Sequence, residues 1–515
     1  MVARRKGLFL RWRAAAAVGA GALPALAFPA PALWWFAYAA LVPWMLLLRS
    51  APTGRRAAFE GWLGGAGFIV AVHHWLLPSL HVFLLPVAAL LALLWIPWAL
   101  LVRGLLGGVP AAGRAGAALV LVPAGWLLSE LARSWQGLGG PWALLGASQW
   151  EVAPALRLAS VGGVWLVSLL VVAVNCALVL LIAVPTVRVP AVGGVAVCAV
   201  LTGAVWLWAP RPEVSGGLRV AVVQPGPVAG AEGPERRFAA GERLTRELAG
   251  RPLDLVVWGE SSVGADLVAR PDLTRRLASL SAEVGAPLLV NVDARRSDRA
   301  GIYKSSVLIG PEGPTGDRYD KMRLVPFGEY VPARSLLGWA TSVGKAAGED
   351  RMRGAAPVVM DLPGSGLRIG PLVCFESAFP DMTRRLTRDG AALLVAQSAT
   401  STFQDSWAPA QHASLASLRA AESGRPMVHA TLTGISEVYG PSGERIGRPL
   451  PTSASTAAVY EVPLAGGATL YVRSGDWAVA ASLTVLAVYC AVQGTRSLRR
   501  PAPEPSAPPA RTARG

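Results

Sequence analysis

Three reactive side chains each stand beside a short apolar run in the second half of the chain. Glu260 ends the run LDLVVWGE, Lys321 lies in RYDKMRLVPFGEYVP, and Cys374 follows RIGPLV. A carboxylate at the end of a buried strand is poorly solvated, which raises its pKa and makes it a better acceptor for a thiol proton. In a closed site, the compact ammonium group of a lysine stabilises an oxyanion. Together the three types predict nucleophilic catalysis by a cysteine.

Cys374 is the predicted nucleophile because a strand that ends sharply before a helix holds its last side chain in an exposed position. A thiol with a pKa of about 8.5 is mostly protonated at neutral pH, so it needs a base or a positive neighbour. Each residue alone has an ordinary explanation: a structural cysteine, a helix-start or loop acid, or a salt bridge of Lys321 with Asp320 or a nearby acid. The prediction therefore depends on the three occurring together.

The composition indicates a membrane protein of two or three domains. The chain has 515 residues, of which 53% are hydrophobic and only 16% charged, and its mean hydropathy is +0.44. A soluble protein of this size carries about a quarter charged residues. Ten basic side chains against one acid lie in residues 1–13 and 496–515, and they account for nine of the sixteen net positive charges. Because they flank apolar segments, they are typical of membrane orientation signals, and nucleic-acid binding is not expected.

Apolar segments divide the chain into four parts. Residues 1–210 are predicted to form a membrane domain of about seven transmembrane helices, and residues 473–494 one more. Residues 211–472 hold short apolar runs separated by glycine, proline and charged turns, with helix-compatible stretches between them, which predicts an α/β domain. Residues 495–515 form a basic, proline-rich tail that we expect to be disordered. The predicted spans are 13–29, 31–48, 60–79, 82–102, 115–132, 158–184, 190–209 and 474–493.

Basic residues in alternate short loops predict the orientation. The positive-inside rule puts the N-terminus in the cytoplasm, so seven crossings later the α/β domain lies outside and an eighth returns the tail to the cytoplasm. A signal peptide in place of the first span is disfavoured because another span follows at once. The aromatic loop at 133–157 either forms a floor or gate under the outer domain or is a simple re-entrant connector.

Three motifs carry a resemblance to a known superfamily. WGESS, YDKMRLVPFGEYVP and LVCFES, in this order, resemble the glutamate, lysine and cysteine motifs of the nitrilase (carbon–nitrogen hydrolase) superfamily, whose fold is a four-layer αββα sandwich. DKMRLVPFGEYVP after seven predicted spans, GGPWALLGASQ at 139–149 and LRAAESGRPMVHATLTGIS at 418–436 resemble the apolipoprotein N-acyltransferase family in particular. This resemblance covers nearly the whole chain.

The resemblance implies a role for five residues. Cys374 would be the nucleophile, Glu260 the general base and Lys321 the oxyanion stabiliser, with Glu329 and Glu376 in support. It further implies ping-pong transfer of an acyl chain from a membrane phospholipid, through a thioester, to the α-amino group of the diacylglyceryl cysteine of a lipoprotein. The expected location is a bacterial plasma membrane. No cofactor or metal is indicated.

The chain departs from the family pattern at four places. Phe375 stands where tyrosine is usual, SATSTF at 398–403 replaces an Asn-Asp-Ala-Trp-Phe type of run, Lys304 replaces asparagine, and Asn291 replaces glycine. We expect these changes to affect substrate preference and rate more than reaction type. LLGWA at 336–340 is expected either to cover the acyl chain or to pack in the core.

Two alternative functions share parts of this evidence. A membrane-anchored amidase or nitrilase would pass the acyl group to water, but it would not need eight spans. A non-catalytic membrane scaffold for a glycosyltransferase acting on polyprenyl phosphate would need that enzyme as a separate partner.

Overall fold

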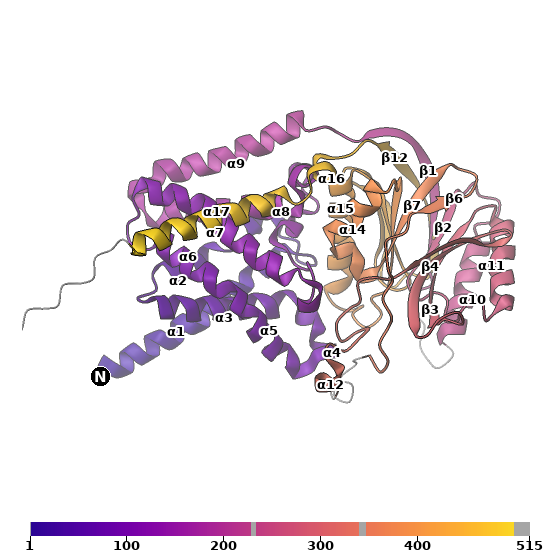
Figure 1. Ribbon diagram of the computed structural model, residues 1–515, viewed down its shortest axis with the longest axis horizontal. Helices are drawn as coiled ribbons and strands as arrows, with labels where there is room; N and C mark the ends of the chain where they lie inside the picture. Colours follow the sequence, from indigo (N-terminus) through magenta and orange to yellow (C-terminus); the bar gives the residue numbers. More distant parts are fainter. Residues whose placement is uncertain (1, 228–232, 339–346, 499–515) are drawn as a thin grey trace, which may run out of the picture.

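The computed structural model describes residues 2–227, 233–338 and 347–498, and it consists of a helical bundle joined end to end with a β-rich domain (Figure 1). The chain up to residue 208 is helical, as its apolar segments predict. Its α-helices are α1 (Val2–Ala22), α2 (Val42–Arg49), α3 (Gly54–Val72), α4 (Leu77–Leu80), α5 (Leu84–Ala92), α6 (Ile96–Leu106), α7 (Ala112–Arg133), α8 (Ala153–Ala183) and α9 (Arg188–Trp208).

Five helical stretches in the described part of the chain are long and apolar enough to cross a membrane. They coincide with five of the eight predicted spans, so the chain is a membrane protein. The first three predicted spans fall on α1 to α3, which do not combine the same length and hydropathy, and the total of about eight stays a prediction. The five stretches are His74–Leu106, Ala112–Arg133, Ala153–Ala183, Pro185–Trp208 and Trp477–Arg496.

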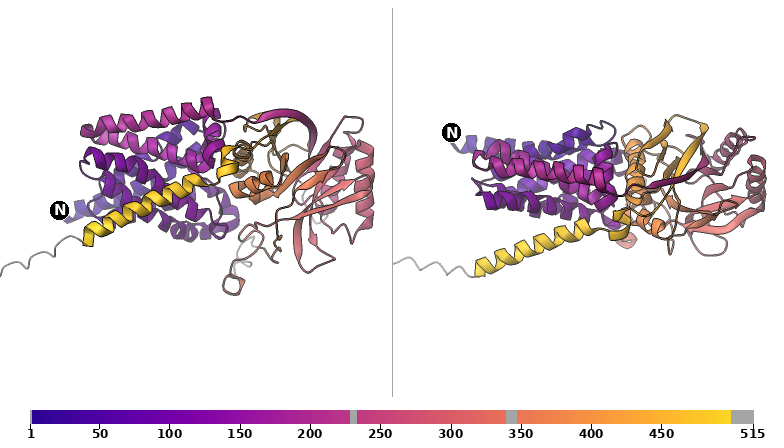
Figure 2. Two further views of the ribbon diagram at one scale, coloured as in Figure 1. Left: turned by 45° about the horizontal axis from the view of Figure 1, so that its top comes forward. Right: turned by 90° about the horizontal axis from the view of Figure 1, so that it is seen from above.

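Helix α17 (Trp477–Leu498) leaves the β-rich domain and runs back along the bundle (Figure 2). In both views of Figure 2 its far end and the start of α1 lie at the end of the bundle that is remote from the β-rich domain. The two ends of the described chain therefore lie on the same side of the bundle, as an even number of crossings requires. Most of the predicted tail, from residue 499 on, lies outside the described residues.

Two six-stranded sheets form the β-rich domain, in the orders β12-β1-β2-β3-β4-β5 and β11-β10-β9-β8-β7-β6. Alternate residues of a strand face opposite sides. In β1, Val220 and Val222 accordingly pack between the sheets, whereas Ala221 and Val223 pack toward the outer helices. The strands are β1 (Glu213–Gln224), β2 (Leu255–Trp258), β3 (Leu288–Arg295), β4 (Ile302–Gly310), β5 (Gly313–Asp320), β6 (Met360–Leu362), β7 (Leu367–Val373), β8 (Leu393–Ser398), β9 (Met427–Thr431), β10 (Ser436–Tyr439), β11 (Arg445–Leu450) and β12 (Thr456–Gly466).

Helices cover the outer face of each sheet, which gives the predicted four-layer αββα sandwich (Figure 1). Helices α10 (Gly233–Arg246) and α11 (Pro271–Val284) cover the first sheet, and α14 (Pro380–Arg388) and α15 (Ala408–Ser423) cover the second. Short helices α12 (Arg334–Leu337) and α16 (Leu470–Ser474) lie in connections. The LLGWA segment at 336–340 lies largely outside the residues whose side chains are described.

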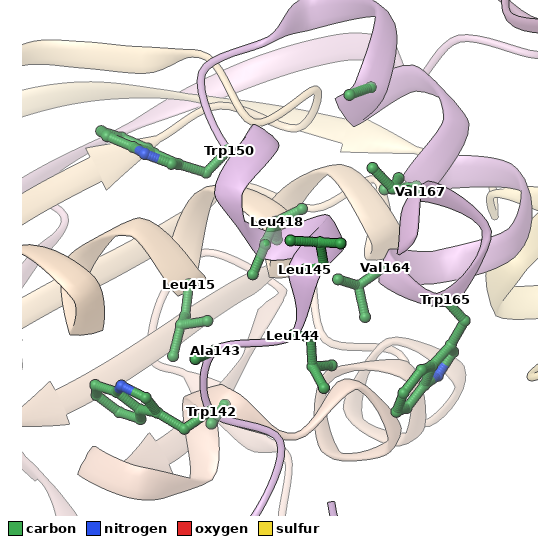
Figure 3. Close-up of a cluster of buried hydrophobic side chains, with 14 of the residues drawn as sticks. Trp142, Ala143, Leu144, Leu145, Trp150, Val164, Trp165, Val167, Leu415 and Leu418 are labelled. Atoms are coloured by element: carbon green, nitrogen blue, oxygen red, sulfur yellow. The ribbon is translucent and has the colours of Figure 1, made fainter. Parts of the chain in front are cut away.

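Helix α15 is buried on both sides because the second sheet packs on one face and the membrane bundle on the other. Leu415 and Leu418 of α15 meet Trp142, Leu144 and other residues of the loop at 133–157 (Figure 3). The indole N–H of Trp142 also donates to Gln411 of α15 over 2.8 Å. This loop therefore lies as a floor under the β-rich domain, as the first of its two interpretations expects.

Helix α8 is kinked where it meets α15. Gly163 has a φ of +70°, and an added Cβ there would approach the ring of Tyr471 to 2.6 Å. The kink frees the backbone N–H of Val164, which donates to the Glu422 carboxylate over 2.7 Å. The buried Arg419 pairs with the same carboxylate over 3.1 Å. A polar contact thus joins the bundle to the domain inside an otherwise apolar interface.

Gly259 allows the two sheets to approach each other at the end of β2. A Cβ at this position would lie 1.9 Å from the backbone N of Leu432, just after β9. Gly259→Ala must therefore displace backbone, and we expect it to lower the free energy of unfolding by about 3 kcal/mol or more. The measurement is thermal unfolding of the purified protein. Gly466→Ala at the end of β12, where an added Cβ meets nothing within 4 Å, is the matched control and should unfold like the parent.

Candidate active site

Ends of strands from both sheets bring the three predicted residues together. Strands β1, β2 and β3 run parallel, and so do β7, β8 and β9, so the carboxyl ends within each set lie at one edge. Glu260 follows β2, Lys321 follows β5 and Cys374 follows β7. Cys374 has a φ of +52°, a backbone conformation that residues other than glycine rarely adopt. This strained turn is the predicted elbow, and it directs the thiol away from the strand.

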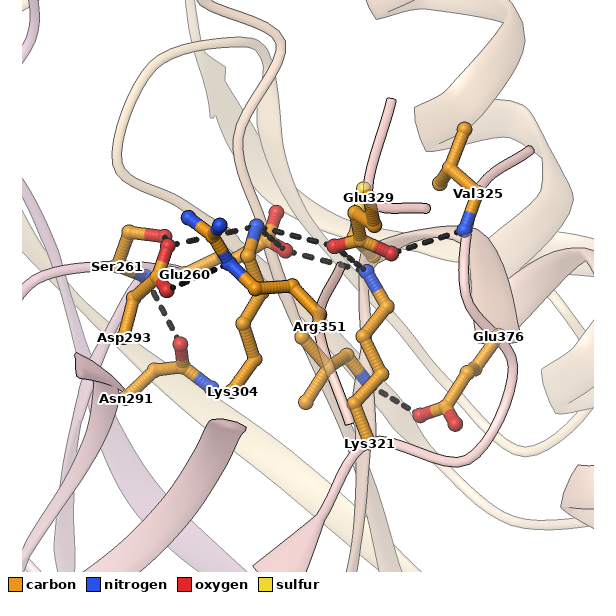
Figure 4. Close-up of polar contacts among 12 residues, drawn as sticks. Glu260, Ser261, Asn291, Asp293, Lys304, Lys321, Val325, Glu329, Arg351 and Glu376 are labelled. Atoms are coloured by element: carbon orange, nitrogen blue, oxygen red, sulfur yellow. Dashed lines mark hydrogen bonds and ion pairs between the residues drawn. The ribbon is translucent and has the colours of Figure 1, made fainter. Parts of the chain in front are cut away.

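Lys321 is paired with two glutamates inside the domain (Figure 4). Its Nζ lies 3.2 Å from Oε1 of Glu260 and 2.7 Å from Oε1 of Glu329, and its side chain is 0% exposed. A charge buried to this extent needs close partners, because the cost of removing it from water is otherwise not recovered. The expected salt bridge of Lys321 with Asp320 or a nearby acid is therefore formed with two other acids and not with Asp320. Asp320 instead accepts hydrogen bonds from Ser305 and Arg318.

A second ammonium group joins this cluster. Nζ of Lys304 lies 2.7 Å from Oε1 of Glu260 and 3.1 Å from Oε1 of Glu329. Asp293, which is the neighbour of Lys304 across the β3–β4 pair, is 3.8 Å away. Two lysines and two glutamates therefore form a compact, charge-balanced group. The sequence identified Lys304 as a departure from the family pattern but gave no role for it.

The cluster determines which protonation states the site favours. Burial opposes ionisation of Glu260, but the positive charges of Lys304 and Lys321 outweigh it, so the pKa of Glu260 falls below its usual range. The predicted rise in this pKa is therefore wrong, because the prediction considered burial alone. Burial, followed by the negative charge of Glu260, raises the pKa of the Cys374 thiol to about 12, although Lys321 opposes the rise. At neutral pH the thiol of Cys374 is therefore protonated and Glu260 is ionised. These are the states in which a carboxylate can accept the proton of a thiol.

Glu376 lies apart from the ion cluster and holds two loops together. Its Oε1 accepts hydrogen bonds from the hydroxyl of Tyr319 and the backbone N–H of Met322, both over 2.7 Å, and its Oε2 accepts from Val373 N over 2.8 Å. These donors flank Lys321 on one side and Cys374 on the other. Glu376 therefore holds the loop that contains Lys321 against the turn that contains Cys374. These hydrogen bonds give it a structural role.

Side chains around Cys374 connect it to the membrane bundle. Nε2 of His412 lies 3.1 Å from the carbonyl oxygen of Cys374, and burial lowers the pKa of this histidine to about 4, so the ring is neutral. Phe375 packs edge to face on Phe379 at 5.0 Å. An added Cβ at Gly140, in the loop at 133–157, would lie 2.6 Å from the Phe375 ring. Phe375 thus makes an apolar contact with the floor of the domain.

The two other departures from the family pattern also lie at the site. Asn291 accepts a hydrogen bond from Ser261 N over 2.9 Å and so orders the residue after Glu260. In the segment 398–403, the carbonyl oxygen of Ser398 accepts the N–H of Glu260 over 3.2 Å. The ring of Phe403 meets Trp75 of the bundle at 5.0 Å. Backbone support for Glu260 is therefore present in this segment, and an aromatic contact ties it to the membrane part.

Comparison with known proteins gives consistent matches. Family models described as carbon-nitrogen hydrolase and as apolipoprotein N-acyltransferase N-terminal domain match residues 219–470 and 20–177. Two proteins named apolipoprotein N-acyltransferase are each 32% identical to this chain. The protein from Geobacter metallireducens covers 92% of this chain and 94% of its own length, and that from Azotobacter vinelandii 95% and 96%. A solved amidase of the nitrilase superfamily from Nesterenkonia aligns over 52% of this chain and 95% of its own, with 19% identity and a TM-score of 0.36.

Alkylation of Cys374 by iodoacetamide should report the charges around the thiol. Because the pKa of Cys374 is raised to about 12, its alkylation rate should climb with pH without a plateau below pH 10. Lys321→Met removes the charge that lowers this pKa most, so at a fixed pH alkylation should be about tenfold slower or more. Lys304→Met should have a smaller effect in the same direction. The measurement is mass spectrometry of the Cys374 peptide against time.

Arg295→Met is the control, since it removes a surface charge that pairs with Glu349. It should leave the alkylation rate unchanged. An unchanged rate in a folded Lys321→Met variant would contradict the assigned electrostatics.

Proposed function

The chain belongs to the apolipoprotein N-acyltransferase family, and on this premise we propose that Cys374 carries the acyl chain between two membrane-bound substrates. The donor is a membrane phospholipid, and the acceptor is the α-amino group of the diacylglyceryl cysteine of a lipoprotein. One observation carries the proposal. Cys374 lies at a strained turn, and its thiol interacts electrostatically with the buried ion cluster. The same turn contacts the loop at 133–157 of the membrane bundle.

In the first half of the proposed reaction, Glu260 accepts the thiol proton of Cys374 as sulfur attacks the ester carbonyl of the phospholipid. The high pKa of the thiol makes a free thiolate costly, so proton transfer accompanies attack. The ammonium group of Lys321 stabilises the oxyanion that forms. When the C–O bond breaks, the proton on Glu260 passes to the leaving oxygen. A lysophospholipid departs, and the acyl chain remains as a thioester.

In the second half, the amine of the acceptor attacks the thioester carbonyl. Glu260 accepts a proton from the amine as the C–N bond forms, and this proton then returns to sulfur when the C–S bond breaks. The products are an N-acylated lipoprotein and the original thiol. Glu329 and Lys304 support both halves of the reaction because they partly neutralise the charges of Lys321 and Glu260. Oε1 of Glu329 lies 2.7 Å from Nζ of Lys321 and 3.1 Å from Nζ of Lys304.

The position of the site suits two substrates that are anchored in a bilayer. The turn that holds Cys374 contacts the loop at 133–157 through Gly140. Phe403, in the segment 398–403 that also supports the backbone of Glu260, contacts Trp75 at the start of a candidate span. Each methylene that leaves an apolar environment for water costs about 0.8 kcal/mol, so a long acyl chain must stay near the membrane throughout. An α/β domain pressed against the bundle meets this requirement.

We also propose how the chain is arranged in the membrane. Residues 1–210 and 473–494 form the membrane part, residues 211–472 the catalytic domain, and residues 495–515 a tail. The basic ends of the chain favour a cytoplasmic position for both termini. The catalytic domain would then lie on the extracytoplasmic side of a bacterial plasma membrane.

The test is acyl transfer from a phospholipid with a radiolabelled acyl chain to a synthetic diacylglyceryl lipopeptide. The parent protein should N-acylate the lipopeptide, and Cys374→Ser should reduce transfer by at least about a thousandfold, since it removes the nucleophile. A lipopeptide with a blocked amino group is the control acceptor and should receive no label.

Release of free fatty acid in preference to lipopeptide acylation would instead identify a membrane-anchored amidase or nitrilase type of hydrolase. Full activity of Cys374→Ser would refute the thioester mechanism. No transfer by the parent protein, together with co-purification of a glycosyltransferase, would favour the scaffold function.

A further inference from the structure

A cavity that is separate from the ion cluster lies where the bundle joins the β-rich domain. It has a volume of about 440 Å³ and lies among the start of α8, the end of α9 and the β10–β11 turn. None of the charged residues of the active-site cluster lines it. Its walls include Trp150, Leu156, Arg157, Trp206, Arg211 and Arg445.

Two of the three arginines in the wall have no carboxylate within ion-pair distance among the described residues. Arg157 is only 8% exposed, and a side-chain nitrogen donates to the carbonyl oxygen of Ala209, while its Nε has no hydrogen-bond partner in the described part of the chain. Arg211 lies over the ring of Trp206, with 5.6 Å between the guanidinium carbon and the ring centroid. A buried cation without an anionic partner is costly, so an anion in the cavity would be stabilised.

The other charged side chains in the wall already have ion-pair or hydrogen-bond partners. Arg445 pairs with Glu151 over 3.2 Å and with Glu437 over 3.3 Å. Glu444 accepts the N–H of Ser442 over 2.9 Å, at the turn between β10 and β11. Arg157 and Arg211 are therefore the two positive groups left for a ligand.

The surroundings of the cavity indicate a lipid as the ligand. Tryptophan side chains favour the boundary between lipid and water, and Trp150 and Trp206 line the cavity at the ends of the helices that meet the β-rich domain. Helix α9 leads from this point into the membrane part and exposes large apolar side chains along its length, among them Val192, Val200 and Leu207. A phosphate held by Arg157 and Arg211 would leave its acyl chains beside α9.

We propose that this cavity binds the headgroup phosphate of an anionic phospholipid, at a site separate from the acyl-transfer site. A zwitterionic headgroup would bring its ammonium group against the two guanidinium groups, so an anionic headgroup such as phosphatidylglycerol is preferred. The lipid would link α8 and α9 to the β10–β11 turn. This inference does not depend on the acyl-transfer reaction.

The test is native mass spectrometry of the full-length protein with phosphatidylglycerol or phosphatidylcholine added in detergent. The parent for this comparison carries Cys374→Ser, so that no acyl chain is transferred. It should retain phosphatidylglycerol in preference to phosphatidylcholine. In addition, Arg211→Gln, which alters an exposed side chain, should weaken the apparent affinity for phosphatidylglycerol by about fivefold.

Arg188→Gln is the matched control, because it removes the same charge at the opposite end of α9. It should bind phosphatidylglycerol like the parent. Equal affinity in Arg211→Gln, an equal loss in Arg188→Gln, or displacement of the lipid by inorganic phosphate would overturn the proposal. A failure of acyl transfer would leave these binding results unchanged, so the two proposals are tested separately.

Discussion

The buried charge of Lys321 is the constraint on which the site depends. An ammonium group with 0% exposure is stable only beside negative partners, and Glu260 and Glu329 supply them at 3.2 and 2.7 Å. Glu260 and Glu329 lie in the loops after β2 and β5, so the carboxyl ends of these two strands must converge. Lys304 balances the second negative charge. The same group of charges thus requires the fold to close at this edge and keeps Glu260 ionised, as the proposed role of a base requires.

The apolar interface between the membrane bundle and α15 explains why the catalytic domain belongs to a membrane protein. A single cluster of buried side chains runs from the bundle through the floor loop and α15 into the second sheet. The turn that holds Cys374 lies on this floor through Phe375 and Gly140. In the proposed reaction, a substrate with acyl chains in the bilayer would meet the thiol close to the membrane part, so its chains would not have to enter water.

The sequence was sufficient for the main features of the site and the sandwich. Glu260 and Cys374 each follow an apolar run, but their strands β2 and β7 lie in different sheets, so their proximity was expected from the resemblance to the superfamily and not from strand geometry. The role of Lys304 was not expected, because it depends on the β3–β4 register that sets this residue opposite Asp293. The lowered pKa of Glu260 was missed for the same reason, since it requires knowing that two ammonium groups are near.

The most direct test of the central claim is the intact mass of the purified protein after incubation with phospholipid, beside a Cys374→Ser control. We predict an added mass equal to one acyl chain, which neutral hydroxylamine removes and which the control lacks. No adduct in the presence of accessible phospholipid, or an adduct of the same mass on Cys374→Ser, would contradict the claim that Cys374 carries the acyl chain.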